Sequence, residues 1–132
     1  MTDVIHDPSQ CQAVKDPELS ATISQMLARV GDKWSMLLVR TLGHGPVRFN
    51  ELRRQIGGIS QKVLSSTLKA LERDGLVSRT VVPSVPPQVS YELTDLGCEL
   101  LIPVTAIVGW TIDNTDRIVA ARYAYDAQHT HA

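Results

Sequence analysis

The chain has 132 residues, of which 43% are hydrophobic and 20% charged, and its formal net charge is −1. These values are typical of one soluble domain with a single modest core. No run approaches the ~20 apolar residues of a membrane span, and the first fifteen residues lack the basic and apolar parts of a secretory signal. We therefore expect a cytoplasmic protein without a membrane partner.

Catalytic and metal-binding motifs are missing from the sequence. The two cysteines, Cys11 and Cys98, are too few for a disulfide framework, and no cysteine or histidine pair has metal-ligand spacing. There is no G-x-S-x-G motif, no phosphate-binding glycine loop and no His/Glu zinc pair, and His44 stands alone between glycines. We expect no metal, no cofactor and no enzymatic activity.

The N-terminal third predicts an arm and two helices. Residues 1–19 have no clear period and contain prolines, so we interpret them as an arm. A first helix follows, capped by Ser20 and ended by Gly31, with apolar residues at helical spacing. A second helix is expected from residue 32 or 33 to residue 42, with Trp34 on its apolar, core-facing stripe.

The middle of the chain predicts two helices joined by a tight turn. A short extended segment, residues 47–48, precedes a helix over residues 49–55. Gly57 and Gly58 supply the sharp turn, because glycine adopts positive φ without steric cost. Ser60 caps the next helix, residues 60–73. One side of this helix is apolar (Leu64, Leu68 and Leu71) and the other polar (Gln61, Lys62, Ser65, Lys69 and Glu72).

The remainder predicts a β-hairpin and further helices. Residues 76–82 and 89–93 are rich in β-branched residues, and the prolines between them belong at the hairpin tip. A long helical run begins at residues 94–95, with Pro103 as a point of interruption or kinking. A separate helix is expected over residues 115–125. We divide the chain into an arm (1–19), a central domain (20–112), a C-terminal helix (113–126) and a disordered tail (127–132).

This order of elements is a helix-turn-helix followed by a wing, in a mainly α fold with a small β-hairpin and extra N- and C-terminal dimerisation helices. The fold offers DNA a helix for the major groove and a ribbon beside it. Residues 46–80 contain seven basic and three acidic residues, a net charge of +4, whereas residues 94–132 contain two basic and five acidic, a net charge of −3. The positive charge therefore lies on the segment expected to approach phosphates.

Individual roles follow from side-chain chemistry. Gln61 is suited to bidentate contact with adenine, and Lys62 to guanine or phosphate. Ser65 allows close approach, and Lys69 is placed for phosphate. Asn50 has two equal alternatives, a contact with the DNA backbone or a cap on its own helix. Arg79 also has two, a contact from the wing to DNA or a cross-strand pair with Glu92. The full set of expected DNA-binding residues is Arg48, Asn50, Arg53, Ser60, Gln61, Lys62, Ser65, Ser66, Lys69, Arg79 and Gln88.

Five ordered segments resemble the HxlR-type winged helix-turn-helix regulators of bacteria. They are GDKWS (31–35), GPVRFNELR (45–53), GISQKVL (58–64), LKALERDGLV (68–77) and VPPQVSYELT (85–94), and the resemblance spans roughly residues 22–112. It implies a homodimer that binds a double-stranded operator near the genes it represses or activates. It also implies a response to oxidants, electrophiles or small molecules.

Two departures from the family pattern stand out. Gln88 occupies a wing position where the family usually has a basic residue, and Cys11, the candidate redox sensor, lies farther upstream than the family's sensing cysteine. For the dimer we expect the first helix and the C-terminal helices, including Trp110 and Ile112, to form the interface. The alternative is that these side chains fold back on the domain. A second function class also stays open, namely a winged helix that contacts only proteins.

Overall fold

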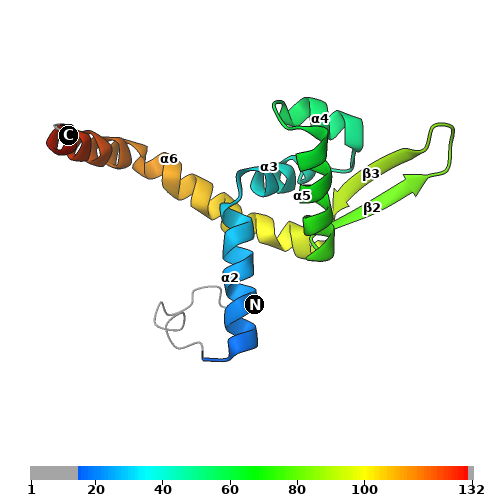
Figure 1. Ribbon diagram of the computed structural model, residues 1–132, viewed down its shortest axis with the longest axis horizontal. Helices are drawn as coiled ribbons and strands as arrows, with labels where there is room; N and C mark the ends of the chain where they lie inside the picture. Colours follow the sequence, from blue (N-terminus) through cyan, green and yellow to red (C-terminus); the bar gives the residue numbers. More distant parts are fainter. Residues whose placement is uncertain (1–14, 131–132) are drawn as a thin grey trace.

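The computed structural model describes residues 15–130 and forms a small helical body with two long projections (Figure 1). The hairpin leaves the body on one side, and the last helix leaves it on the other. The elements are α2 (Pro17–Gly31), α3 (Lys33–Leu42), β1 (Val47–Arg48), α4 (Phe49–Ile56), α5 (Gln61–Arg73), β2 (Val77–Val82), β3 (Gln88–Leu93) and α6 (Asp95–His129).

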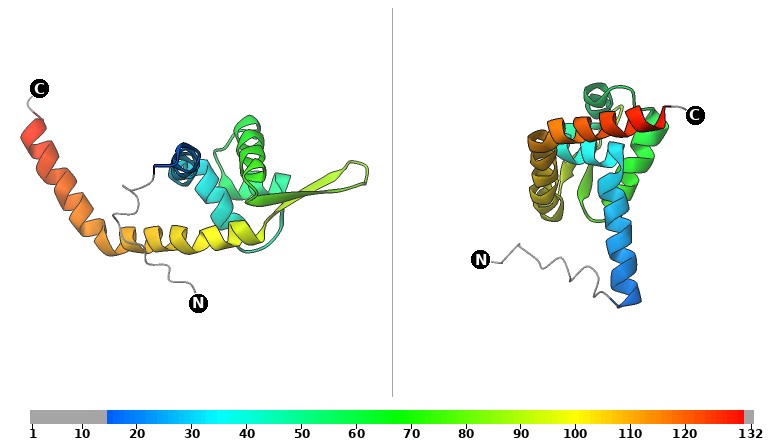
Figure 2. Two further views of the ribbon diagram at one scale, coloured as in Figure 1. Left: turned by 90° about the horizontal axis from the view of Figure 1, so that it is seen from below. Right: turned by 90° about the vertical axis from the view of Figure 1, so that its left-hand side faces the viewer.

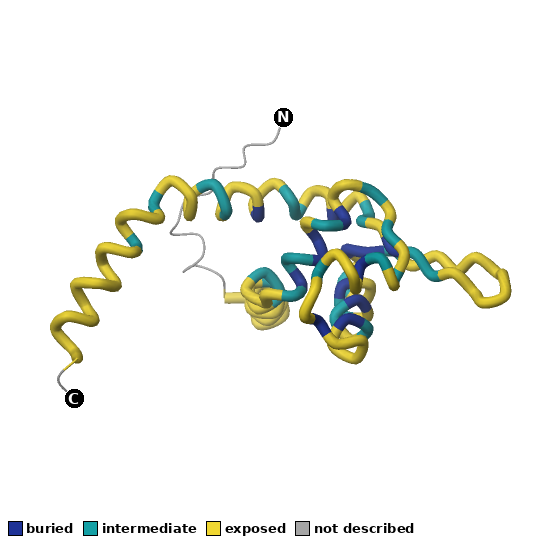
Figure 3. Tube along the Cα trace, turned by 90° about the horizontal axis from the view of Figure 1, so that it is seen from above, coloured by how far each residue is buried: buried dark blue, intermediate teal, exposed yellow. Residues whose placement is uncertain are grey.

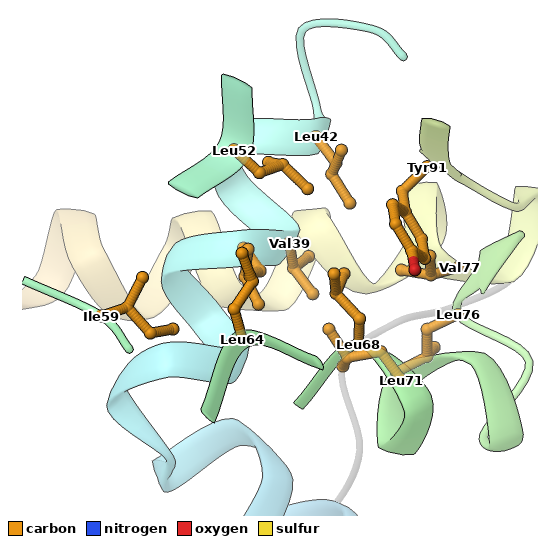
Figure 4. Packing of buried hydrophobic residues seen from close by; sticks show 11 residues of the cluster. Val39, Leu42, Leu52, Ile59, Leu64, Leu68, Leu71, Leu76, Val77 and Tyr91 are labelled. Carbon is orange, nitrogen blue, oxygen red and sulfur yellow. The ribbon is translucent and has the colours of Figure 1, made fainter. Parts of the chain in front are cut away.

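The core lies between α3, α4, α5 and the base of the hairpin (Figure 4). Helix α5 contributes the three leucines of its apolar side, all fully buried. Trp34 is half-buried and packs against the core, in agreement with the sequence. The buried hydrophobic residues of this cluster are Leu38, Val39, Leu42, Leu52, Ile59, Leu64, Leu68, Leu71, Leu76, Val77 and Tyr91.

The three strands form an antiparallel sheet in the order β1-β3-β2. β1 pairs with β3 through Val47 and Tyr91, and β2 pairs with β3 from Val77↔Leu93 to Val82↔Gln88. The prolines lie at the tip, as the sequence predicts, because a proline cannot donate to a ladder. The wing is therefore tied to the helix-turn-helix at its base and through β1, and its tip projects from the body (Figure 1).

Polar contacts fix α2 and α3 against the body. The Asp32 side chain caps α3, accepting hydrogen bonds from the Ser35 backbone N–H at 2.8 Å and the fully buried Ser35 hydroxyl at 2.6 Å. Arg29 of α2 forms an ion pair with Asp74 at the C-terminal end of α5, with 2.8 Å between Nε and Oδ2. This pair holds α2 to the end of the helix expected to meet DNA.

The structure corrects the expected N-terminal boundary. α2 begins at Pro17, with Asp16 as its N-cap, and not near Ser20. The cause is local, because proline is favoured in the first turn of a helix and the Asp16 carboxylate accepts from the Glu18 N–H at 2.9 Å. Residues 17–19, expected in the arm, are therefore helical.

The C-terminal prediction of a separate helix is wrong. α6 is one helix of 35 residues that contains Pro103 and continues through residues 127–129, which we expected in a disordered tail. Figure 2 shows α6 bending in the orange part of its ribbon, C-terminal to Pro103. In this part the side chains of Thr111, Asn114 and Thr115 hydrogen-bond to carbonyls four residues earlier. Such contacts commonly bend helices.

By length and apolar composition alone, α6 is long and apolar enough to cross a membrane, contrary to the expectation from the sequence, and only 11% of its most apolar stretch is buried in the single chain. Figure 3 shows most of the helix exposed. Large apolar side chains on it, including Trp110 (60% exposed) and Ile112 (69% exposed), face solvent in the single chain. An exposed apolar surface of this kind marks an interaction site.

Candidate nucleic-acid interface

Helix α5 presents the polar side that the sequence predicts. Gln61, Lys62 and Lys69 are exposed, and Ser65 is half-buried. The opposite leucines are fully buried against α3 and the sheet, so α5 cannot rotate without exposing them. The helix thus displays amide, hydroxyl and ammonium groups on a rigid scaffold, which is the chemistry that contacts base edges and phosphates.

Two serines of the predicted set are hydrogen-bonded to their own helix. The Ser60 hydroxyl accepts from the Val63 N–H at 3.1 Å and caps α5, as expected from its position after the glycine turn. The Ser66 hydroxyl donates to the Val63 carbonyl at 3.1 Å. A hydroxyl engaged in this way still has acceptor capacity for an external donor.

The turn before α5 is built on glycine. Gly57 and Gly58 have φ of +68° and +73°, a region that side-chain-bearing residues avoid. Ile59 then enters the core at 6% exposure, and Ser60 begins the cap. The turn therefore sets the angle at which α5 leaves α4.

Helix α4 carries a second group of cations. Arg48 is its N-cap and Arg53 is exposed on its last turn. The alternative role of Asn50 as a cap is wrong, because Asn50 lies inside the helix and no side chain caps it. Sequence analysis missed Arg54, which pairs with Glu51. Hydrogen bonds from Gln55 and Arg54 to Glu51 lower the pKa of its carboxyl.

A hollow of about 430 Å³ lies between α5 and the base of the hairpin, lined by Ser65, Lys69, Glu72, Arg79 and Tyr91. The proposed cross-strand pair of Arg79 with Glu92 is wrong, because the register places Arg79 opposite Tyr91 and Ser78 opposite Glu92. Arg79 is exposed, and among residues 15–130 the ion pairs are Arg29–Asp74 and Arg54–Glu51. The Arg79 charge is therefore available to a ligand.

Tyr91 is a residue of this site that sequence analysis missed. It is 8% exposed, packs with Phe49 and lines the same hollow as Lys69 and Arg79. Alternation along β3 is the signal that predicts an inward Tyr91, but only the strand register shows which cation lies opposite.

A second hollow, of about 480 Å³, separates the N-terminal end of α4 from the tip-side end of the wing, where Pro86, Pro87 and Gln88 line it. It brings together Arg48, Asn50 and Arg54 from one side and Gln88 from the other. Arg53 does not line it. Among residues 15–130 there is no group of three or more His, Cys, Asp or Glu side chains suited to hold a metal ion.

Comparison with known proteins identifies the family. The family model for HxlR-like helix-turn-helix proteins matches residues 29–119. The chain belongs to this family. It is 41% identical over 98 residues to the HTH-type transcriptional regulator YtfH of Escherichia coli, covering 74% of this chain and 78% of YtfH. This HxlR-like protein is a transcriptional regulator of the helix-turn-helix type.

Solved structures share the fold of this HxlR-like chain. The regulator ytfH from Salmonella typhimurium is 39% identical with a TM-score of 0.68, covering 76% of this chain and 89% of that one. The redox regulator HypR in its reduced form is 36% identical with a TM-score of 0.69, covering 75% and 98%. In this HxlR-like protein Cys11 lies outside the described residues, and Cys98 is an exposed free thiol on α6.

Proposed function

We propose that this HxlR-like regulator binds a two-fold symmetric DNA operator as a homodimer in the cytoplasm, with the N-terminal part of α5 in the major groove. The observation that carries the proposal is the division of α5 into a buried leucine side and an exposed polar side. A helix fixed from behind and polar in front is the geometry with which helix-turn-helix proteins contact bases.

The proposed contacts divide into two kinds. Gln61 and Lys62 begin α5 and are exposed, so they reach base edges and discriminate between sequences. Lys69, Arg79 and Tyr91 surround the hollow beside the hairpin, where a phosphate of the same strand would be held. The second hollow, between Arg48, Asn50 and Gln88, holds the neighbouring backbone against the wing.

The homodimer is proposed from the apolar surface that one chain leaves uncovered. On α2, Leu19 and Leu27 are 49% and 66% exposed, and on α6, Trp110 and Ile112 are 60% and 69% exposed. A second copy that covers α2 and α6 removes this surface from water, and it doubles the site with half-sites about one helical turn of DNA apart. It also accounts for the apolar composition of α6 without a membrane.

The test is footprinting of the purified protein on DNA that flanks its own gene, followed by titration of the protected site. We expect symmetric protection, and we expect Gln61→Ala/Lys62→Ala to lose at least ~tenfold in affinity because two base contacts are removed. The matched control, Lys15→Ala/Gln128→Ala, removes the same side-chain types from exposed positions near the chain ends. Equal affinity of the dimeric Gln61/Lys62 variant and the parent would refute the proposal, and elution in the void of a DNA column at low salt would favour a protein-contact role.

A thiol is the proposed sensor of the signal to which the regulator responds. We propose Cys11 as the thiol through which an oxidant or electrophile acts, as its place in the polar N-terminal segment suggests. Mild oxidation should then release the operator from the parent protein but not from Cys11→Ser. Release that is unchanged in the variant rules the switch out, and Cys98→Ser serves as the control.

A further inference from the structure

A hollow of about 240 Å³ lies where α2, α3 and α6 meet, away from the residues proposed to contact DNA. Its lining is apolar apart from two basic residues on α3. The apolar lining residues are Val30 from α2, Met36 and Leu37 from α3, and Val104, Ile107 and Val108 from α6. Val104 is buried at 5% exposure, Val30, Met36, Leu37 and Val108 are half-buried, and Ile107 is exposed, so three helices line a hollow that is open to solvent on one side.

The two basic residues, Lys33 and Arg40, flank the apolar lining. They lie seven positions apart on α3, which is about 10 Å along the helix axis, on the same face as Met36 and Leu37. Neither belongs to the ion pairs found among residues 15–130, which are Arg29–Asp74 and Arg54–Glu51. The Lys33 ammonium lies 4.6 Å from the centroid of the Trp34 ring.

We propose that this hollow is a binding site for a small organic anion with an apolar body, such as an aromatic carboxylate. The apolar lining takes the hydrocarbon part, and the carboxylate pairs with Lys33 or Arg40 at the rim of the hollow. The volume is below the range of drug-sized sites, so the ligand has roughly ten to fifteen non-hydrogen atoms. A few polar groups that fix orientation within an apolar lining are the usual arrangement of small-molecule sites.

Other occupants fit the hollow less well. A nucleic acid would meet an apolar lining instead of hydrogen-bonding groups, and the hollow shares no residue with the two hollows beside α4, α5 and the hairpin. A segment of a second copy would leave both cations facing apolar side chains unless it brought a carboxylate to them. Because neither Lys33 nor Arg40 joins an ion pair among residues 15–130, the two cations favour an anion small enough to enter.

The test is calorimetric titration of the full-length protein, without DNA, with 1-naphthoate and with its neutral counterpart 1-naphthalenemethanol. We expect one naphthoate per chain with a dissociation constant below about 1 mM, and weaker binding of the alcohol. Lys33→Met/Arg40→Met keeps the apolar length of both side chains and removes the charges. It should weaken naphthoate binding about tenfold and leave alcohol binding unchanged. Arg73→Met, which removes an exposed charge from the end of α5, is the matched control.

Three outcomes overturn the proposal: no heat of binding with naphthoate up to several millimolar, equal binding of acid and alcohol, or equal affinity in the double variant and the parent. Sedimentation of the double variant adds a fourth. If Lys33→Met/Arg40→Met changes the dissociation constant of the dimer and naphthoate does not bind to the parent, the hollow is part of the interface between copies. Because no DNA is present, failure of operator binding leaves this result unaffected.

Discussion

Replacement of Gly97 by alanine tests how α6 is held to the wing. Gly97 is buried in the first turn of α6, directly against the Leu76 carbonyl that precedes β2. A Cβ at this position would lie well inside the 3.0 Å limit that real Cβ atoms respect, and the obstacle is backbone rather than a flexible side chain. The start of α6 must therefore move away from the hairpin in the variant.

Three contributions set the change in the free energy of unfolding in Gly97→Ala. Overpacking of a filled site costs about 1–3 kcal/mol. The displaced carbonyl also accepts from the Thr94 N–H at 3.1 Å, and weakening that bond costs about 1 kcal/mol. The higher helix propensity of alanine returns about 1 kcal/mol. We expect Gly97→Ala to lower the free energy of unfolding by about 2 kcal/mol, a urea midpoint shift of about 1 M for a protein of this size.

The assay is urea unfolding followed by circular dichroism at one fixed protein concentration, since the stability of the proposed dimer would depend on concentration. The control is Gly31→Ala, at the last residue of α2, where an added Cβ meets nothing within 4 Å. Its stability should stay equal or rise by up to about 1 kcal/mol. A midpoint for Gly97→Ala equal to that of Gly31→Ala would show that the close approach of α6 to β2 does not exist.

Three further substitutions test separate contacts. Lys69→Ala should reduce the slope of log affinity against log salt by about 0.9 per subunit, and an unchanged slope would mean that Lys69 meets no phosphate. Ser60→Ala removes the cap on α5 and should cost about 1 kcal/mol in urea unfolding; no loss would mean that the Val63 N–H has another acceptor. Arg29→Met leaves Asp74, 18% exposed, without its partner and should cost about 1–2 kcal/mol. Adding Asp74→Asn should recover part of that loss, and strictly additive effects would argue against the pair.

The sequence was sufficient to predict the elements whose signals are local. The glycine turn, the Ser60 cap and the leucines of α5 depend on neighbours within one or two turns of the chain, and the structure places them as expected. The proline-rich hairpin tip follows equally from residues that cannot pair in a ladder. For such features, amino-acid type and spacing already contain the physical cause.

Features that depend on distant contacts were not predictable in this way. Pro103 is a general signal for interruption, yet α6 continues through it and bends farther on. The residue opposite Arg79 on β3 depends on the register of the two strands, which the length of the hairpin alone does not determine. The role of Tyr91 beside Lys69 requires α5 and the sheet to be placed together, and no spacing rule supplies that.

The division of charge along the chain also explains how a protein with a sequence pI near 6.4 can approach DNA. The segment of net charge +4, residues 46–80, includes α4, α5 and the start of β2, whereas α6 carries the acidic excess. A helix of 35 residues is about 50 Å long, several times the ~10 Å over which salt screens charge, and Figure 1 shows its end on the far side of the body from the hairpin. Phosphates near α5 are therefore screened from Asp113, Asp116 and Asp126 in the distal half of α6, whereas Asp95 and Glu99 lie at its start, near the hairpin. The same helix exposes apolar side chains, which makes a second copy of the chain a better neighbour for it than DNA.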